Sequence, residues 1–118
     1  MMYPAGEYIQ IRNTTNIVID DLYYSYWEHD RLKVRSIKAK QKENFMIITT
    51  NLQKDYDLIF YFGKDESKRF IYPDAVKKMT CDTTWCYQFF KIVESQGALL
   101  IEIDDEGKQA YFEDNQNT

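Results

Sequence analysis

The chain has 118 residues with four glycines and two prolines, a length that suits one domain with a single core and a composition that excludes collagen-like and low-complexity chains. Its net charge of −4 and its pI of about 5.0 disfavour a nucleic-acid-binding protein, because that class needs a basic domain or a large basic patch. No apolar run is long enough to cross a membrane, and the first residues have no signal-peptide pattern. We therefore expect a cytoplasmic protein without a membrane partner, and the many Ile, Lys, Tyr and Asn residues indicate an AT-rich bacterial or phage genome.

The first half of the chain reads as strands separated by polar turns. Residues 8–12 alternate apolar and polar side chains, and this period of two predicts a half-buried strand. Residues 13–16 form a turn cluster whose short polar side chains can bond the local backbone. Residues 17–27 predict a long strand or a bent pair of strands, with a bulge or bend at Asp20 and Asp21, because acidic residues fit poorly on a buried pleat. Further strands are predicted at residues 32–37, 45–50 and 56–62.

The second half continues this pattern with one expected helical segment. A short strand is predicted at residues 68–72, followed by a short helix that begins at Pro73 and ends at Met79, since a proline at the first helical position loses no hydrogen bond. Strands are then expected at residues 85–94 and 98–104, and a weak one at 109–112. The polar residues after them predict a disordered tail.

The number and spacing of these elements indicate the fold class. About seven to nine short strands, with turns every eight to twelve residues and at most one short helix, are typical of an all-β protein. We expect an antiparallel two-sheet β-sandwich, with a small barrel as the alternative. Residues 1–112 would form this single domain, and residues 113–118 the polar, disordered tail.

The aromatic segment from Leu22 to Trp27 is the most distinctive stretch of the sequence. Strand alternation sends its members to opposite faces, so at most half of them can bind a ligand or a partner. The expected core members are Leu22, Tyr24 and Tyr26, and the expected surface members are Tyr23, Ser25 and Trp27. The alternative is that the segment serves only to build the core and its rim.

Six basic residues follow between Arg31 and Lys42. They indicate a docking face for a partner with an acidic surface. The alternatives are protection of an edge strand and mutual neutralisation with the acidic C-terminal stretch. Together with the aromatic segment they give the candidate binding residues, which are Tyr23, Trp27, Arg31, Lys33 and Arg35.

The sequence contains few residues or motifs that are typical of catalytic or metal-binding sites. The sequence has no nucleophile elbow, phosphate-binding loop or zinc-protease motif, and its single histidine, His29, lies in a predicted hairpin turn. Cys81 and Cys86 are expected to be free thiols in a reducing compartment, with a disulfide as the alternative. The acidic residues near Asp20 match no calcium-binding loop. We therefore predict no catalytic residue, no metal ligand and no cofactor.

The spacing of several strand and turn residues resembles that of a known layout. It consists of Ile9, Ile11, Asn13 and Thr15, then the strand of residues 17–22 and the pair Ser25 and Tyr26, and finally residues 103–107, which read IDDEG. This order resembles small bacterial β-sandwich proteins of unknown function. The resemblance implies an immunoglobulin- or transthyretin-like sandwich and carries over no active-site residue.

Three functions compete at this point, and the third is an enzyme that uses the acidic residues or a thiol. The first is a non-catalytic protein-binding domain with an accessory, regulatory or immunity-type role, which would lose support if Tyr24, Trp27 and Lys33 were buried or scattered over different faces. The second is a small-ligand or carbohydrate-binding module, which requires a cavity bordered by Trp27, Trp85 or the tyrosines. Each of them is compatible with a homo-oligomer, because exposed aromatic sheet faces tend to pair.

Overall fold

The computed structural model describes residues 6–26, 31–49, 52–63, 68–78 and 85–116. These residues contain eight strands and one helix. The elements are β1 (Gly6–Asn13), β2 (Leu22–Ser25), β3 (Leu32–Lys33), β4 (Lys42–Ile48), β5 (Tyr56–Phe62), β6 (Arg69–Val76), β7 (Trp85–Ser95), β8 (Ala98–Ile103) and α1 (Asp105–Gln116).

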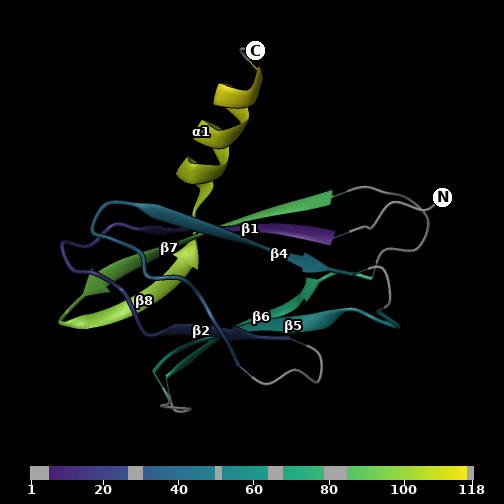
Figure 1. Cartoon of the computed structure of the whole chain (residues 1–118), viewed down its shortest axis with the longest axis horizontal. Coiled ribbons are helices and arrows are strands. Elements are labelled where there is room, and N and C mark those ends of the chain that lie inside the picture. Colours follow the sequence, from purple (N-terminus) through teal and green to yellow (C-terminus); the bar gives the residue numbers. More distant parts are fainter. Residues whose placement is uncertain (1–5, 27–30, 50–51, 64–67, 79–84, 117–118) are drawn as a thin grey trace.

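The strands form two sheets of four, and this confirms the all-β class. The strand order is β4-β1-β7-β8 in the first sheet and β3-β2-β5-β6 in the second. Figure 1 shows the two sheets as an upper and a lower layer, with α1 rising from the upper one. Every strand pairing is antiparallel as expected except β1 with β7, which is parallel. A parallel pair needs a long crossover, and here the chain passes through the whole second sheet between the two strands.

The core lies between the facing sides of the two sheets. Alternate residues of β1 and β7 point inward, among them Ile9, Ile11 and Ile92, and each is fully buried. They meet Leu58 and Phe60 of β5, which are also fully buried. Each such side chain contributes roughly 1.5–3 kcal/mol on burial. The period of two in these strands therefore places on one face the apolar side chains that hold the two sheets together.

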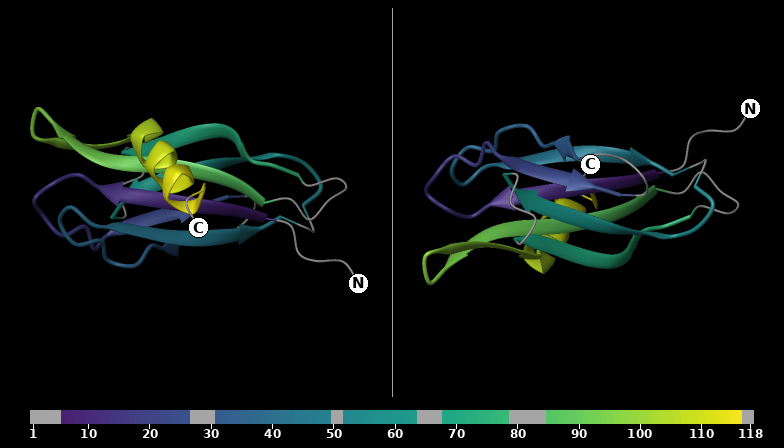
Figure 2. Two further views of the ribbon diagram at one scale, coloured as in Figure 1. Left: turned by 90° about the horizontal axis from the view of Figure 1, so that it is seen from above. Right: turned by 90° about the horizontal axis from the view of Figure 1, so that it is seen from below.

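The helix lies where the sequence predicted a weak strand and a disordered tail. Residues 109–112 and 113–116 all belong to α1, and residues 117–118 lie outside the described part. Asp104 starts the helix, because its side chain accepts the N–H of Gly107 at 3.0 Å and its carbonyl accepts that of Lys108 at 3.1 Å. Figure 2 shows α1 over β1 and β7, on the outer face of the first sheet.

Two aromatic side chains attach this helix to the sheet. Tyr111 lies 5.7 Å from Tyr87 and 5.4 Å from Phe89 between ring centroids, and Phe112 lies 5.6 Å and 6.0 Å from the same two rings. These contacts cover part of the outward-facing side of β7. In the part of the chain that the structure describes, no helix has the length and hydropathy needed to span a membrane.

The prediction of a short helix from Pro73 to Met79 is wrong. Residues up to Val76 belong to β6, and Met79 lies outside the described residues. β6 is an edge strand, where a proline is tolerated because its missing N–H faces no neighbour. Asp74 follows with a φ of 53° and donates its N–H to Oδ1 of Asp57 at 2.9 Å, so the chain bends here without becoming helical.

Candidate functional site

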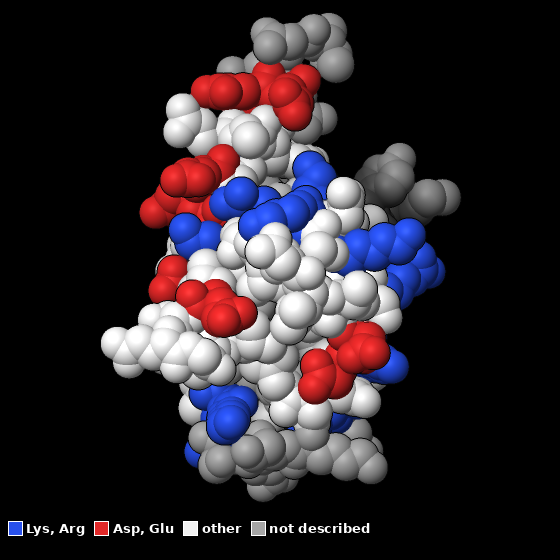
Figure 3. Space-filling view, turned by 90° about the vertical axis from the view of Figure 1, so that its left-hand side faces the viewer, with Lys and Arg blue, Asp and Glu red and all other residues white. Residues whose placement is uncertain are grey.

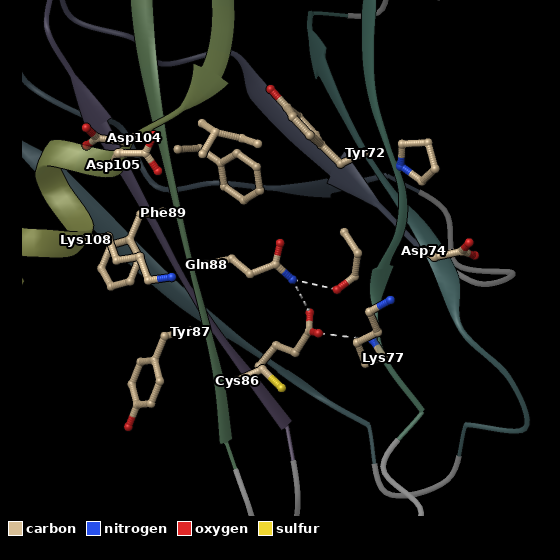
Figure 4. Close-up of a pocket in the computed structure, with 15 residues that line it drawn as sticks. Tyr72, Asp74, Lys77, Cys86, Tyr87, Gln88, Phe89, Asp104, Asp105 and Lys108 are labelled. Carbon is tan, nitrogen blue, oxygen red and sulfur yellow. Dashed lines mark hydrogen bonds between the residues drawn. The ribbon is translucent and has the colours of Figure 1, made fainter.

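A cavity of about 560 Å³ opens at one side of the molecule, between β7 of the first sheet and β6 of the second (Figure 4). It opens there because β8 pairs with β7 only from Phe90 to Ser95. At Asp104 the chain turns away into α1. Residues 85–89 of β7 are therefore left without a strand neighbour on this side among the described residues, and we call them the open edge.

The walls of this cavity are mainly apolar. Tyr72, Phe89, Phe90 and Ile103 line it. The Tyr72 hydroxyl donates to the carbonyl of Ile101 at 2.6 Å, and burial raises the pKa of this tyrosine to about 12. The phenol is therefore a neutral, fixed wall of the cavity at physiological pH.

A buried carboxyl group lies on the inner side of this cavity. Glu7 of β1 points inward, as Ile9 and Ile11 do, and is 0% exposed. Its Oε1 accepts the backbone N–H of Lys77 at 3.0 Å, and its Oε2 accepts Nε2 of Gln88 at 2.9 Å. The dashed lines in Figure 4 show how these bonds join β1, the end of β6 and β7.

The environment of Glu7 changes its protonation. Burial raises the pKa of Glu7 from 4.5 to about 7, and the hydrogen bonds from Lys77 and Gln88 oppose that shift without cancelling it. The carboxyl group therefore exists in both protonation states near neutral pH. Groups with perturbed pKa values in clefts are candidates for functional sites.

The amide of Gln88 presents an acceptor to the cavity. Its Nε2 donates both to Glu7 and to the carbonyl of Ala75, the latter at 2.5 Å. Figure 4 shows the amide oxygen pointing away from these two partners, on the side of Tyr72. No donor among the described residues reaches this oxygen, so a ligand can bond to it.

The thiol of Cys86 lies beside this network but is poorly suited to nucleophilic chemistry. Burial and the neighbouring Glu7 raise the pKa of the Cys86 thiol. A raised pKa keeps the group as a thiol, whereas nucleophilic cysteines need the thiolate. Cys86 is free, and Cys81, which was expected to be free as well, lies outside the described residues.

The end of the cavity beside α1 is held by an ion pair. Arg12 donates Nε to Oδ2 of Asp104 at 2.9 Å and Nη2 to Oδ1 at 2.8 Å. Burial alone would raise the pKa of Asp104, but the hydrogen bonds from Arg12 and Gly107 outweigh it, so the pKa lies below its ordinary value. Asp104 is 0% exposed, and we assign it the structural role of fixing the start of α1.

The residues that the sequence proposed for binding lie elsewhere. Tyr23 pairs with Lys33 on β3 and with Tyr61 on β5, and Tyr61 pairs with Arg69 on β6. The Arg31 guanidinium lies 4.2 Å from the centre of the Tyr61 ring. These five residues form a line across the outer face of the second sheet, which we call the basic row. Trp27 lies outside the described residues.

A second cavity of about 560 Å³ contains Arg35, the remaining residue of the predicted set, and is also bordered by Lys33 of the basic row. Lys33 and Arg35 line it together with Glu43 and Met46, at the side of the molecule formed by β3 and β4. Tyr24 is buried as expected for a core member and stacks on Phe45 at 4.1 Å between ring centroids. The aromatic and basic residues are thus divided between the core, an outer face and this cavity.

A further band of basic residues is visible beneath α1 in Figure 3. Arg12 pairs with Lys42 on β4 and with Lys91 on β7, which gives a basic line across the outer face of the first sheet. Arg12 is bound to Asp104, and Lys91 lies opposite Glu102 on β8. Acidic side chains from the C-terminal stretch therefore accompany this band within the fold.

Sequence reasoning missed Glu7, Gln88 and Tyr72. One signal was available, since Glu7 occupies an inward position of the same alternation as Ile9 and Ile11. In the described part of the chain, no three His, Cys, Asp or Glu side chains gather as a metal site requires. Comparisons with protein-family models, curated proteins and solved structures find no match.

Proposed function

We propose that this protein is a small-ligand-binding module and that its site is the cavity between β6 and β7. The observation that carries the proposal is an apolar, aromatic cavity of about 560 Å³ with one open hydrogen-bond acceptor, Gln88 Oε1, beside the buried Glu7. Ligand sites in proteins are typically concave, mainly apolar and equipped with a few placed polar groups. The requirement for a tyrosine-bordered cavity is met by Tyr72 and Tyr87.

The polar groups restrict the ligand class. Gln88 Oε1 accepts a hydrogen bond, so the favoured ligand carries a donor such as a phenol hydroxyl or an amine. Tyr72, Phe90 and Ile103 surround an apolar or aromatic body. A ligand with only acceptors would leave Gln88 Oε1 without a partner in the complex, and a buried polar group without a partner costs about 1–3 kcal/mol.

A role without catalysis is part of this proposal. Both carboxylate oxygens of Glu7 are already held by hydrogen bonds, which leaves the group badly placed to move a proton. The raised pKa of Cys86 disfavours a thiolate. For the fold we propose the transthyretin-like sandwich of the two types that the sequence resembles. Two sheets of four strands match neither the seven nor the nine strands of immunoglobulin domains.

The test uses p-cresol, whose hydroxyl suits Gln88 and whose ring suits the walls. Titrated into the ¹⁵N-labelled protein, it should give saturable shifts of the Gln88 side-chain amide and of the backbone amides of Lys77 and Phe90. Toluene has the same shape without the hydroxyl and should bind about five- to tenfold more weakly, the expected loss for one hydrogen bond.

Two matched variants locate the site. Ile103 lines the cavity and is 61% exposed, whereas Ile48 is 49% exposed on β4 and does not line it. Ile103→Phe should reduce p-cresol binding, and Ile48→Phe should leave it unchanged. If p-cresol gives no saturable shift at the cavity, or if both variants behave alike, the proposal is wrong.

A second candidate is the protein-binding function, which the burial of Tyr24 away from the exposed Lys33 weakens and the basic row supports. Lys33 and Arg69 are exposed at its ends, with Tyr23 between them. This arrangement suits a partner with an acidic surface. Retention of the protein on immobilised polyglutamate should fall in the Lys33→Glu/Arg69→Glu double variant. The control is Lys38→Glu, and retention that is the same in both variants would remove this candidate.

A further inference from the structure

We propose that the open edge of β7 accepts an extended peptide strand. The peptide would run antiparallel to β7, in line with β8, and would place a side chain in the cavity. This inference rests on the proposed function, because it names the ligand class of the same cavity.

The backbone of β7 shows which groups are available. Phe89 accepts the N–H of Asp104 at 2.8 Å on the side of β8, and Ile92 accepts the N–H of Thr14 at 3.1 Å on the side of β1. The N–H and C=O of successive strand residues point to alternate sides. Tyr87 therefore directs both groups to the side of β8, where that strand has already ended. Cys86 and Gln88 direct theirs to β1.

The edge lacks the features that usually protect an exposed strand. On β6, the opposite edge of the opening, Pro73 and the positive φ of Asp74 interrupt the pairing groups. The open edge reads WCYQF and contains no proline, glycine or charged residue. Unprotected edges of this composition are templates for pairing with another strand. A strand partner thus fits this edge better than it fits β6.

The register assigns a position to each side chain of the peptide. The residue opposite Tyr87 would stand on the outer face, next to the Tyr87 ring and the aromatic residues of α1. Its two neighbours, opposite Cys86 and Gln88, would stand on the inner face and point into the cavity. Strand addition of this kind obtains affinity from the main chain and specificity from alternate side chains. The cavity would therefore select, at the inward position opposite Gln88, a residue with an apolar or aromatic body and a donor at its end, such as tyrosine.

Charge and space favour a peptide over a second copy of this chain. Asp74 and Asp105 border the opening, and neither has an ion-pair partner among the described residues. Lys77 is paired with Asp55 at 3.7 Å, which leaves Lys108 as the basic residue at the helical end. A basic residue in the peptide is thus favoured. A second copy pairing edge to edge would be limited to residues 85–89, because β8 occupies this side of β7 from Phe90 onward.

The test follows amide hydrogen exchange in the full chain with a synthetic probe, acetyl-Thr-Tyr-Val-Val-Thr-Lys-amide, whose tyrosine would lie opposite Gln88 and whose first valine would lie opposite Tyr87. In the free protein the Tyr87 amide should exchange faster than those of Cys86 and Gln88, which face β1. Saturating peptide should slow exchange at Tyr87 by about tenfold or more, as a new strand hydrogen bond requires. The control peptide carries an N-methyl group on the nitrogen of its first valine, which removes the main-chain donor opposite Tyr87 and keeps every side chain.

The outcomes separate this inference from the proposed function. Protection of Tyr87 by the first peptide and not by the N-methylated one supports the inference. Equal binding of both peptides, or no protection by either while p-cresol still binds, overturns it and leaves the cavity proposal intact. Protection of Tyr87 that rises with protein concentration alone assigns the edge to a second copy and overturns the inference as well.

Discussion

At the scale of single residues, Glu7 combines a polar group with the position of a core residue. The next two inward residues of β1, Ile9 and Ile11, are isoleucines, and all three side chains are 0% exposed. A buried carboxyl group is tolerated only with hydrogen-bond partners, which Lys77 and Gln88 supply. These partners do not restore the solvation that an ionised carboxylate has in water.

This environment makes stability depend on pH. The pKa of Glu7 in the fold, about 7, lies above its unfolded value of 4.5, so the folded state favours the protonated form. The resulting stabilisation is fully present below pH 4.5 and is lost as the pH rises through 7. Between pH 5 and 8 the wild type should lose roughly 2–3 kcal/mol of unfolding free energy from this group. Urea unfolding at both pH values measures it.

Two variants isolate the contribution of Glu7. Glu7→Gln cannot ionise at this position. Between pH 5 and 8 its unfolding free energy should therefore fall by roughly 2–3 kcal/mol less than that of the wild type. Glu43→Gln, on the neighbouring strand β4, removes one carboxylate but leaves Glu7 in place and is the control. A Glu7→Gln protein whose stability falls as steeply as that of the wild type would contradict the assignment of this pKa.

Gly107 is a second residue whose type follows from its surroundings. A Cβ atom at this position would lie 2.2 Å from Oδ2 of Asp104, and Asp104 is fixed by Arg12. Gly107→Ala should therefore lower the unfolding free energy by about 1–3 kcal/mol, although alanine normally favours a helix. Thermal unfolding followed by circular dichroism measures the effect. Gln109→Ala, an exposed site in the same helix, should be nearly neutral, and equal effects at both sites would refute the steric argument.

At the scale of elements, prediction from the sequence succeeded where the local residue pattern determines the structure, and it failed where contacts between distant parts of the chain determine it. The predicted strands at residues 8–12, 56–62, 85–94 and 98–104 lie within or closely match β1, β5, β7 and β8. The predicted polar turn after β1 is confirmed, because the Asn13 side chain donates to the carbonyl of Ile17 at 2.7 Å and accepts the N–H of Thr15 at 3.0 Å. In these segments the local pattern and the final environment agree.

The elements that were missed depend on tertiary contacts. The start of α1 reads as a turn, and its large apolar residues are the adjacent pair Tyr111 and Phe112 instead of a repeating stripe. They pack on β7, which no local pattern indicates. The site was missed for the same reason, since the parallel pairing of β1 with β7 brings Glu7 beside Cys86 from a distant part of the chain.

At the scale of the whole molecule, β1 lies between two strands from different parts of the chain, β4 on one side and β7 on the other. Residue 9 pairs with residue 45 on one side and with residue 88 on the other. Closing the longer loop costs about 0.7 kcal/mol more than closing the shorter one, on the logarithmic dependence of loop entropy on length. Two-sheet β proteins with such distant contacts fold slowly, in milliseconds to seconds.

This difference predicts an order of assembly that kinetics can measure. The pairing of β1 with β4 should form before that of β1 with β7, so Ile47→Val on β4 should mainly slow folding, and Ile92→Val on β7 should mainly speed unfolding. Both side chains are almost fully buried, at 1% and 0% exposure. Each substitution should cost about 0.5–1.5 kcal/mol. Stopped-flow folding and unfolding in urea gives both rates, and a larger effect on folding from Ile92→Val would show that β7 joins β1 first.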